Sequence, residues 1–318
     1  MRVAEDLNAA LHAVMAADPA VYLLGEDIAD PYGGAFKISR GLSTRFPGRV
    51  LATPISEGGF TGVAAGLALA GDAAIVEIMF GDFIALAFDQ LFNFASKSVS
   101  MYGSRKPMRL IVRCPSGGGR GYGPTHSQSP MKHFIGMPGL RVYELSPFHD
   151  STAVFEEMLA TAEPCLFIED KVLYTKQSGT AAVPFHWSSD GTIARVFLDD
   201  HPDYILIAPG GVAHRAMEAM RSLLTEAELS GTLLVPSRLW PLSVTADMLD
   251  ELGARATLVV EESTAGGTWG AEVAHQLGRP LTVVHSRDSV IPTAAHLERD
   301  VLVQPSTIHR RVLEALRD

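Results

Sequence analysis

The stretch from Thr53 to Gly62 reads TPISEGGFTG and places one carboxylate, that of Glu57, between a strand and an apolar helix. Residues 50–52 are Val-Leu-Ala and predict a short buried strand. Residues 63–70 contain only Val, Ala, Gly and Leu, so we expect a helix that is enclosed on all sides. Ser56 is expected to cap this helix and Gly71 to end it.

Glu57 stands at the start of this helix. A carboxylate beside an apolar, low-dielectric wall holds a proton more readily, so we expect Glu57 to exchange a proton with a bound heterocycle near neutral pH. The alternative is that Glu57 only complements the helix dipole. The other loops of the predicted sheet distinguish between these two interpretations.

Two further loops follow predicted strands. Phe83 comes after the strand 73–80, and a loop rich in glycine leads from the strand 109–113 to His126. Singly, Phe83 fits a core aromatic residue and His126 a hydrogen-bonded structural histidine. Together with Glu57 they lie on three successive strand-to-helix loops, where open parallel sheets place their ligands. This constellation predicts a functional site, and we expect the glycines to let the backbone approach a ligand closely.

Strands and helices alternate along the whole chain, which indicates an α/β fold with a mostly parallel sheet and helices on both faces. From about Thr175 to Pro202 the periodicity lapses into Ser, Gly, Asp and Pro, which predicts a linker or domain edge. A second α/β unit begins with the strand 204–208. The length of 318 residues fits two domains.

These motifs resemble the β subunit of the thiamine diphosphate-dependent E1 component of 2-oxo acid dehydrogenase complexes, a family that includes pyruvate, branched-chain and acetoin dehydrogenases. The resemblance runs from Gly25 to Leu302. It implies a transketolase-like pyrimidine-binding domain over residues 1–180, a linker over 181–200 and a smaller α/β carboxy-terminal domain over 201–318.

The resemblance also implies roles for individual residues. Glu57 matches the glutamate that hydrogen-bonds N1′ of the aminopyrimidine, and the cofactor then serves as the electron sink for loss of carbon dioxide. Phe83 matches the aromatic residue that packs on the pyrimidine. His126 matches a proton donor or acceptor that faces the substrate. Glu26 matches an acidic position near the cofactor, with an exposed loop carboxylate as the alternative. The other expected cofactor neighbours are Ile55, Ser56, Met79, Ile84, Ala85 and Leu86, and Phe80 and Tyr122 are expected to join Phe83 and His126 at the substrate.

One motif of thiamine diphosphate enzymes is missing. They bind the diphosphate through Mg²⁺ held by Gly-Asp-Gly and a later Asn, whereas this chain has no Gly-Asp-Gly and its last asparagine is Asn93. We therefore expect no metal site here and at most half of a cofactor site. In the family the other half and the Mg²⁺ come from an α subunit in an α2β2 heterotetramer, so the chain alone is expected to be inactive.

Other features narrow the function classes. The glycine loop lacks the ending of a P-loop, and His126 lacks the companions of a zinc site. Thr161 and Glu163 stand where many relatives have the Asp and Asn of a structural K⁺ site, which puts that site in doubt. The net charge of −10 argues against nucleic acid, and no apolar run reaches the length of a membrane span. Two cysteines and the lack of a signal-peptide core predict free thiols and a cytoplasmic location.

Three hypotheses follow. The first is an E1 β subunit that performs oxidative decarboxylation and passes the acyl group to a lipoyl domain, with a lipoyl acyltransferase core as a further partner. The second is a subunit of a thiamine-dependent carboligase or non-oxidative decarboxylase in a biosynthetic pathway. The third is a non-catalytic assembly subunit, which the presence of Glu57, Phe83 and His126 disfavours. The sequence does not name the 2-oxo acid.

Overall fold

The computed structural model describes residues 1–317 and divides them into two compact units. Unit 1 comprises residues 1–116, 136–143 and 150–178, and unit 2 comprises 117–135, 144–149 and 179–317. Unit 2 therefore takes two short segments from within the span expected for the first domain. The expected linker over 181–200 holds two strands, β7 (His186–Ser189) and β8 (Ile193–Phe197), which pair with each other.

Unit 1 is built on a sheet whose strands run in the order β5-β6-β4-β3-β1-β2. Their bounds are β1 (Val21–Gly25), β2 (Val50–Ala52), β3 (Ala73–Glu77), β4 (Leu110–Ser116), β5 (Arg141–Glu144) and β6 (Cys165–Asp170). From β2 to β6 the neighbouring strands are parallel. Every residue of β3, β4 and β6 is buried, as expected for a parallel sheet covered on both faces.

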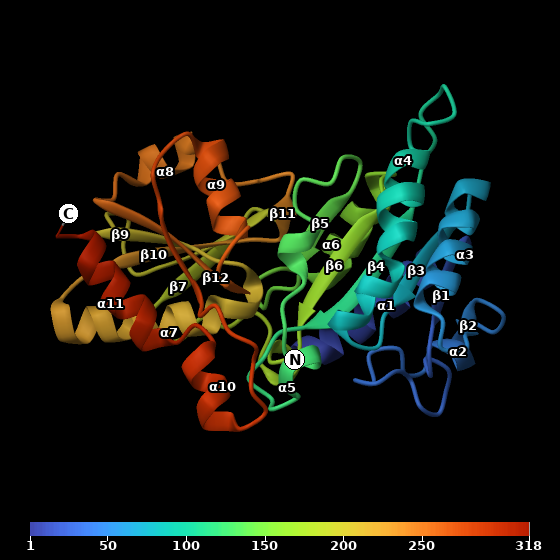
Figure 1. Cartoon of the computed structure of the whole chain (residues 1–318), viewed down its shortest axis with the longest axis horizontal. Coiled ribbons are helices and arrows are strands. Elements are labelled where there is room, and N and C mark those ends of the chain that lie inside the picture. Colours follow the sequence, from blue (N-terminus) through green and yellow to red (C-terminus); the bar gives the residue numbers. More distant parts are fainter. Residues whose placement is uncertain (318) are drawn as a thin grey trace. The chain divides into compact units, whose positions relative to one another are not determined.

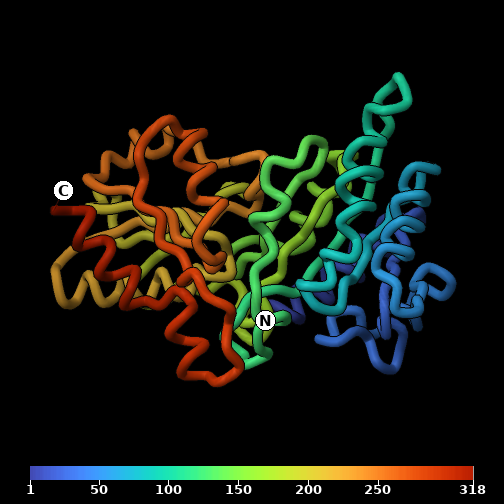
Figure 2. Tube along the Cα trace, in the orientation of Figure 1, coloured from blue at the N-terminus to red at the C-terminus, as the bar shows by residue number. Residues whose placement is uncertain are grey.

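The helices of unit 1 form two groups around this sheet (Figure 1). In one group, α1 (Val3–Ala17) packs on α6 (Ser151–Ala160). In the other, α3 (Glu57–Ala70) packs on β3 and on two irregular helices, η1 (Gly81–Ala87) and η2 (Gln90–Ala95). Shorter helical turns are α2 (Leu42–Arg45), α4 (Ser96–Ser98) and η4 (Leu173–Thr175). After α4 the chain projects as a loop before it enters β4 (Figure 2).

Unit 2 has its own sheet, in the order β13-β12-β9-β10-β8-β7. Its further strands are β9 (Tyr204–Ile207), β10 (Gly231–Pro236), β12 (Ala256–Thr264) and β13 (Thr282–Ser286), which are parallel to one another, whereas β8 is antiparallel to β10. In Figure 1, α7 and α11 lie on one side of this sheet and α8 and α9 on the other.

The remaining elements of unit 2 include those that carry and support the glycine loop. The helices are α5 (Gly123–His126), α7 (Gly210–Ala227), α8 (Ala246–Leu252), α9 (Trp269–Leu277), α10 (Ala295–Val301) and α11 (Pro305–Ala315), with η3 (Met131–His133) and the short strand β11 (Arg238–Trp240). In residues 1–317, no helix combines the length and apolar character that crossing a membrane requires.

Candidate active site

The N-terminus of α3 is built as the sequence suggests, with one difference. Glu57 opens the helix and only 3% of it is exposed. Gly71 ends the helix in the left-handed conformation with φ 109°. The Ser56 hydroxyl makes no capping hydrogen bond, so the predicted side-chain cap is wrong. The backbone N–H of Ser56 instead donates to the carboxylate of Glu26, which draws Glu26 to the start of α3.

Glu26 follows β1 directly and is buried, with 6% of it exposed. The alternative of an exposed loop carboxylate is therefore wrong. Its Oε1 has no hydrogen-bond partner in residues 1–317. Burial raises the pKa of Glu26, and the negative charges of Glu57 and Asp27 raise that pKa further. Glu26 and Glu57 thus form a buried pair of carboxylates in which one oxygen is left to accept a proton donor from outside the chain.

Small residues let α3 and η1 approach closely beside this pair. A Cβ on Gly58 would lie 3.0 Å from the carbonyl oxygen of Leu86 and 3.3 Å from Oε1 of Gln90. Phe83 lies in η1 and is half-buried, as are Met79 and Phe80 just before it. The ring of Phe80 meets that of Phe36 edge to face, with 5.6 Å between ring centroids. Unit 1 therefore brings the carboxylate pair and the η1 segment to the same end of the sheet.

The remaining cofactor candidates differ in exposure. Ile84 is buried, whereas Ala85, Leu86, Ser56 and Ile55 are exposed, Ile55 by 84%. The expectation that α3 is enclosed on all sides is wrong for the chain by itself. The helix leaves a stripe exposed at Gly59, Val63, Gly66 and Ala70. The expected buried strand at residues 50–52 is β2, an edge strand whose Leu51 and Ala52 are exposed.

Exposed apolar side chains also lie on β2, before α3, on η1 and at η2. We call the set of Leu51, Ile55, Val63, Leu86, Phe88 and Phe92 the α3 apolar face, and each of them is at least 36% exposed. The lack of charge along α3 correctly indicated an apolar environment, but this chain does not supply that environment on the outer side of the helix. Apolar patches of this kind mark interaction surfaces.

Tyr122 and His126 lie in unit 2, whereas Glu26, Glu57 and Phe83 lie in unit 1. Tyr122 immediately precedes α5 and is 40% exposed, and His126 ends α5 and is half-buried. The structure brings the members of each group together within their own unit. The combined site, with the carboxylates and His126 around one ligand, stays a prediction.

The glycine loop before α5 is fixed by carboxylates of this chain. The N–H of Gly118 donates to Glu262 Oε1 at 2.6 Å, and the N–H groups of Gly119 and Gly121 donate to the two oxygens of Glu298 at 2.9 and 3.0 Å. The expectation that these glycines serve a ligand therefore fails for three of the loop's amides. Neither glutamate was predicted from the sequence. Glu262 had an available signal, because an acidic pair ends the apolar run Val259-Val260-Glu261-Glu262 in a strand.

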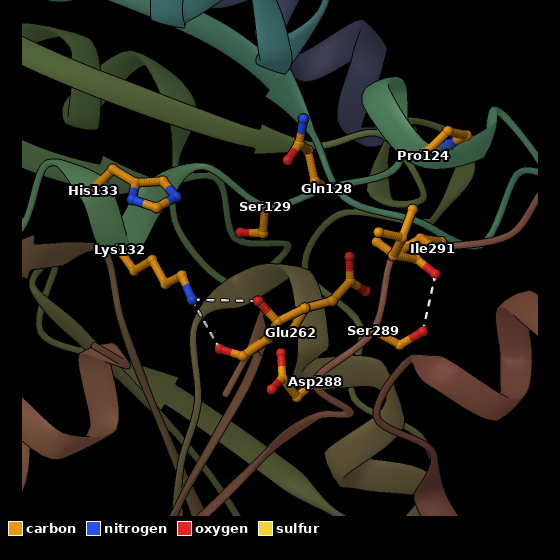
Figure 3. Close-up of a pocket in the computed structure, with 11 residues that line it drawn as sticks. Pro124, Gln128, Ser129, Lys132, His133, Glu262, Asp288, Ser289 and Ile291 are labelled. Atoms are coloured by element: carbon orange, nitrogen blue, oxygen red, sulfur yellow. Dashed lines mark hydrogen bonds between the residues drawn. The ribbon is translucent and has the colours of Figure 1, made fainter. Parts of the chain in front are cut away.

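A cavity of about 470 Å³ lies within unit 2 (Figure 3). It is lined by Pro124, Gln128, Ser129, Lys132, His133, Glu262, Thr264, Asp288, Ser289, Val290 and Ile291. The Lys132 ammonium donates to the carbonyl oxygens of Thr264 at 3.0 Å and Gly266 at 2.8 Å, so it holds the turn before α9. Burial and the charge of Lys132 lower the pKa of His133.

At the positions where a potassium site is in doubt, the side chains bind protein groups. The Thr161 hydroxyl donates to the carbonyl oxygen of Met158 at 2.9 Å. Glu163 forms ion pairs with Arg105 at 2.8 Å and Arg141 at 2.6 Å. Within residues 1–317, no cluster of three or more His, Cys, Asp and Glu side chains is arranged to hold a metal ion.

Proteins of known family resemble this chain over nearly its whole length. The transketolase pyrimidine-binding domain family matches residues 1–177. The mitochondrial pyruvate dehydrogenase E1 component subunit beta-2 of Oryza sativa subsp. japonica is 30% identical over 99% of this chain and 86% of that protein. The corresponding beta subunit of Saccharomyces cerevisiae is 30% identical over 99% and 89%.

A third relative is named for a different activity. The acetoin:2,6-dichlorophenolindophenol oxidoreductase subunit beta of Cupriavidus necator is 33% identical over 69% of this chain and 67% of that protein. Among solved structures, a split-gene transketolase described as an inactive β4 tetramer aligns with a TM-score of 0.76 at 20% identity, over 100% of this chain and 99% of that one. A transketolase of Pichia stipitis aligns with a TM-score of 0.72 at 12% identity, over 100% and 46%. At these identities the solved structures establish the fold alone.

Proposed function

The chain belongs to the family of β subunits of thiamine diphosphate-dependent E1 components of 2-oxo acid dehydrogenases, and from this premise we propose that it decarboxylates a 2-oxo acid together with an α subunit. The acyl group is then passed to a lipoyl carrier. The proposal rests on the buried carboxylate pair of Glu26 and Glu57, in which Glu26 Oε1 has no hydrogen-bond partner in the part of the chain that the structure describes.

This pair fits the aminopyrimidine half of thiamine diphosphate. A buried carboxylate without a partner is costly unless a donor reaches it, and a protonated ring nitrogen and an amino group are such donors. Glu57 holds a proton at N1′, and Glu26 Oε1 accepts from a further N–H. The bound cofactor supplies the electron sink for decarboxylation. Phe83 offers an aromatic surface to the pyrimidine, and His126 donates or accepts a proton at the substrate.

A partner chain is part of the proposal. The sequence lacks the Gly-Asp-Gly of the diphosphate and Mg²⁺ site, so we assign these groups to an α subunit. The α3 apolar face begins beside Glu57 and offers a surface on which a partner can close over the pyrimidine. We propose an α2β2 heterotetramer, with a lipoyl acyltransferase core as the further partner.

We also propose a cytoplasmic location. Both cysteines, Cys114 and Cys165, are buried free thiols, which suits a reducing compartment. Burial raises the pKa of Cys165 to about 12, so this thiol resists ionisation and oxidation.

A second candidate substrate is acetoin, a 2-hydroxy ketone. The relative from Cupriavidus necator, which is 33% identical, carries this compound in its name. A 2-hydroxy ketone and a 2-oxo acid both present a carbonyl next to the bond that breaks. The same residues therefore serve either substrate, and the choice is made by the rest of the substrate pocket.

The test is reconstitution. The chain is purified alone and together with the α subunit from its native source, and a panel of 2-oxo acids and acetoin is screened with an artificial electron acceptor in the presence of thiamine diphosphate and Mg²⁺. We expect turnover only with both subunits. Robust turnover by the chain alone contradicts the split site, and no turnover of any panel member by the assembled pair contradicts the proposed activity.

A further inference from the structure

The glycine loop that carries Tyr122 and His126 has a backbone conformation that favours glycine at several positions. Four of its glycines, Gly117, Gly119, Gly121 and Gly123, have φ between 70° and 86°, a region that favours glycine. A chain with this much freedom has many conformations, so the position of His126 depends on what restrains the loop. The restraints come from Glu262 in β12 and Glu298 in α10.

Glu298 is the stronger restraint. It is buried, with 3% of it exposed, and each carboxylate oxygen accepts one loop amide, from Gly119 at 2.9 Å and from Gly121 at 3.0 Å. Hydrogen bonds from backbone N–H groups to a carboxylate are charge-assisted and stronger than bonds between neutral groups. Two such bonds from one side chain fix both the distance and the orientation of the loop segment.

Glu262 restrains the start of the loop. Its Oε1 accepts from Gly118 at 2.6 Å, and its Oε2 lies 2.6 Å from Nη1 of Arg215, which neutralises its charge. Arg215 also donates to the carbonyl oxygen of Val303 at 3.3 Å. The Gly118 anchor is therefore tied to α7 and to the segment that follows α10.

The residues on either side of α10 also pack closely against the loop. A Cβ on Gly118 would lie 2.6 Å from Leu302 Cδ1, and a Cβ on Gly123 would lie 2.8 Å from Thr293 Oγ1. The loop thus lies against the segment 293–302 with no room for larger residues at these two positions. The glycines serve this close approach to the chain's own segment.

We infer that Glu298 and Glu262 are positioning residues, which hold the loop so that Tyr122 and His126 keep one place relative to the substrate. They act through backbone amides and need touch neither substrate nor cofactor. The consequence for turnover rests on the proposed function, whereas the anchoring of the loop is a property of the chain itself.

The test uses Glu298→Gln in the full chain, free and assembled with the α subunit. The glutamine amide turns one acceptor into an N–H donor that faces a loop amide, so one of the two bonds is lost. We expect amide hydrogen exchange of the segment 117–126 to become at least about tenfold faster. In the assembled enzyme, kcat/KM should fall about 10- to 100-fold, because small misplacements of reacting groups cost that much. The affinity for thiamine diphosphate should stay unchanged.

Asp300→Asn is the matched control, since Asp300 is an exposed carboxylate on the same helix. It should leave both exchange and kcat/KM as in the wild-type chain. Glu298→Asp is the second variant, because it keeps the charge but withdraws the carboxylate by one methylene, and it should loosen the loop as well.

The outcomes separate the two levels of the proposal. Unchanged exchange of 117–126 in both Glu298 variants overturns the anchoring. Faster exchange with unchanged kcat/KM overturns the positioning role. If the wild-type assembly turns over no substrate, the proposed function fails, and faster exchange in the Glu298 variants still supports the anchor.

Discussion

Unit 1 holds two groups of buried carboxylates, and a cation compensates only one of them. Gly25, which precedes Glu26, is paired with Glu77 across β1 and β3. Glu77 and Glu169 share Arg113, which donates to Glu77 at 2.5 Å and to both oxygens of Glu169 at 2.7 Å. Glu26 and Glu57 have no cation among the groups that set the pKa of Glu26.

Two hydroxyl groups also donate to the compensated cluster. The Tyr174 hydroxyl donates to Glu169 at 2.7 Å, and the Ser39 hydroxyl donates to Glu77. In the other pair, Glu26 Oε1 has no hydrogen-bond partner among the described residues 1–317. Buried charge in a fold is normally paired, so an unpaired carboxylate marks a place where something else must bind. We propose that Glu77 and Glu169 hold the sheet together, whereas Glu26 and Glu57 are kept for a ligand.

The largest effect is expected at Glu57. Glu57→Gln removes the group that we propose to hold the N1′ proton, and kcat of the assembled enzyme should fall by about 10²- to 10⁴-fold. Assembly with the α subunit should be retained, as measured by size-exclusion chromatography. Glu156→Gln, an exposed acid on α6, is the control and should keep full activity. Near wild-type turnover of Glu57→Gln contradicts the proposed role.

The cluster around Arg113 should contribute to the free energy of unfolding. Arg113→Met leaves Glu77 and Glu169 buried without their cation, and the free energy of unfolding should fall by about 3–5 kcal/mol. Arg109→Met removes a 2.5 Å ion pair with Asp18 that is about 30% exposed, and it should cost less than about 1 kcal/mol. Denaturant unfolding of both variants decides this. Equal losses would mean that burial of the pair carries no extra cost.

Unit 2 offers a third kind of buried group, a histidine kept neutral. Burial lowers the pKa of His149 from 6.5 to about 4, and the nearby charge of Asp190 only partly offsets this. Because the unfolded chain binds the proton more readily, stability is lost as pH falls from 6.5 to 4, by up to about 3 kcal/mol. His149→Gln should flatten this part of the stability profile, and exposed His201→Gln should not. An equal slope in both variants contradicts this assignment.

The smallest effect is expected at Glu26. Its raised pKa means that the folded chain favours the protonated acid, so a penalty absent below the ordinary value of 4.5 appears as pH rises through the folded pKa. Glu26→Gln removes that penalty and should raise the melting temperature at pH 7. It should also weaken thiamine diphosphate binding in the assembled enzyme. A lower melting temperature at pH 7 with unchanged cofactor affinity would place Glu26 among the structural acids.

Local pattern predicted much of this fold. The alternation of strands and helices predicted the parallel sheet of unit 1, and Gly71 predicted the end of α3. The boundaries of the units were harder to predict from the sequence, because the segments 117–135 and 144–149 belong to unit 2 through contacts between residues that are distant in sequence. The strand β7 contains two serines and leads into Asp190-Gly191, so its pairing with β8 outweighs a weak local strand propensity.

The candidate site was predictable in its motifs and less so in its surroundings. Glu57 could be found from its place before an apolar helix. Periodicity could not reveal that the outer stripe of α3 is exposed, because an apolar helix reads the same whether its own chain or another covers it. Glu298 was missed because its partners, Gly119 and Gly121, are backbone amides about 180 residues away, at separations of 179 and 177. Backbone N–H donors leave no pattern in the sequence.

The most direct measurement is the structure of the chain assembled with its α subunit and thiamine diphosphate. The account predicts that a carboxylate oxygen of Glu57 lies about 2.6–3.2 Å from N1′ of the pyrimidine, the range of a hydrogen bond that can hold a proton. A Glu57 carboxylate that points away from the ring, or a cofactor bound wholly within one chain, contradicts it.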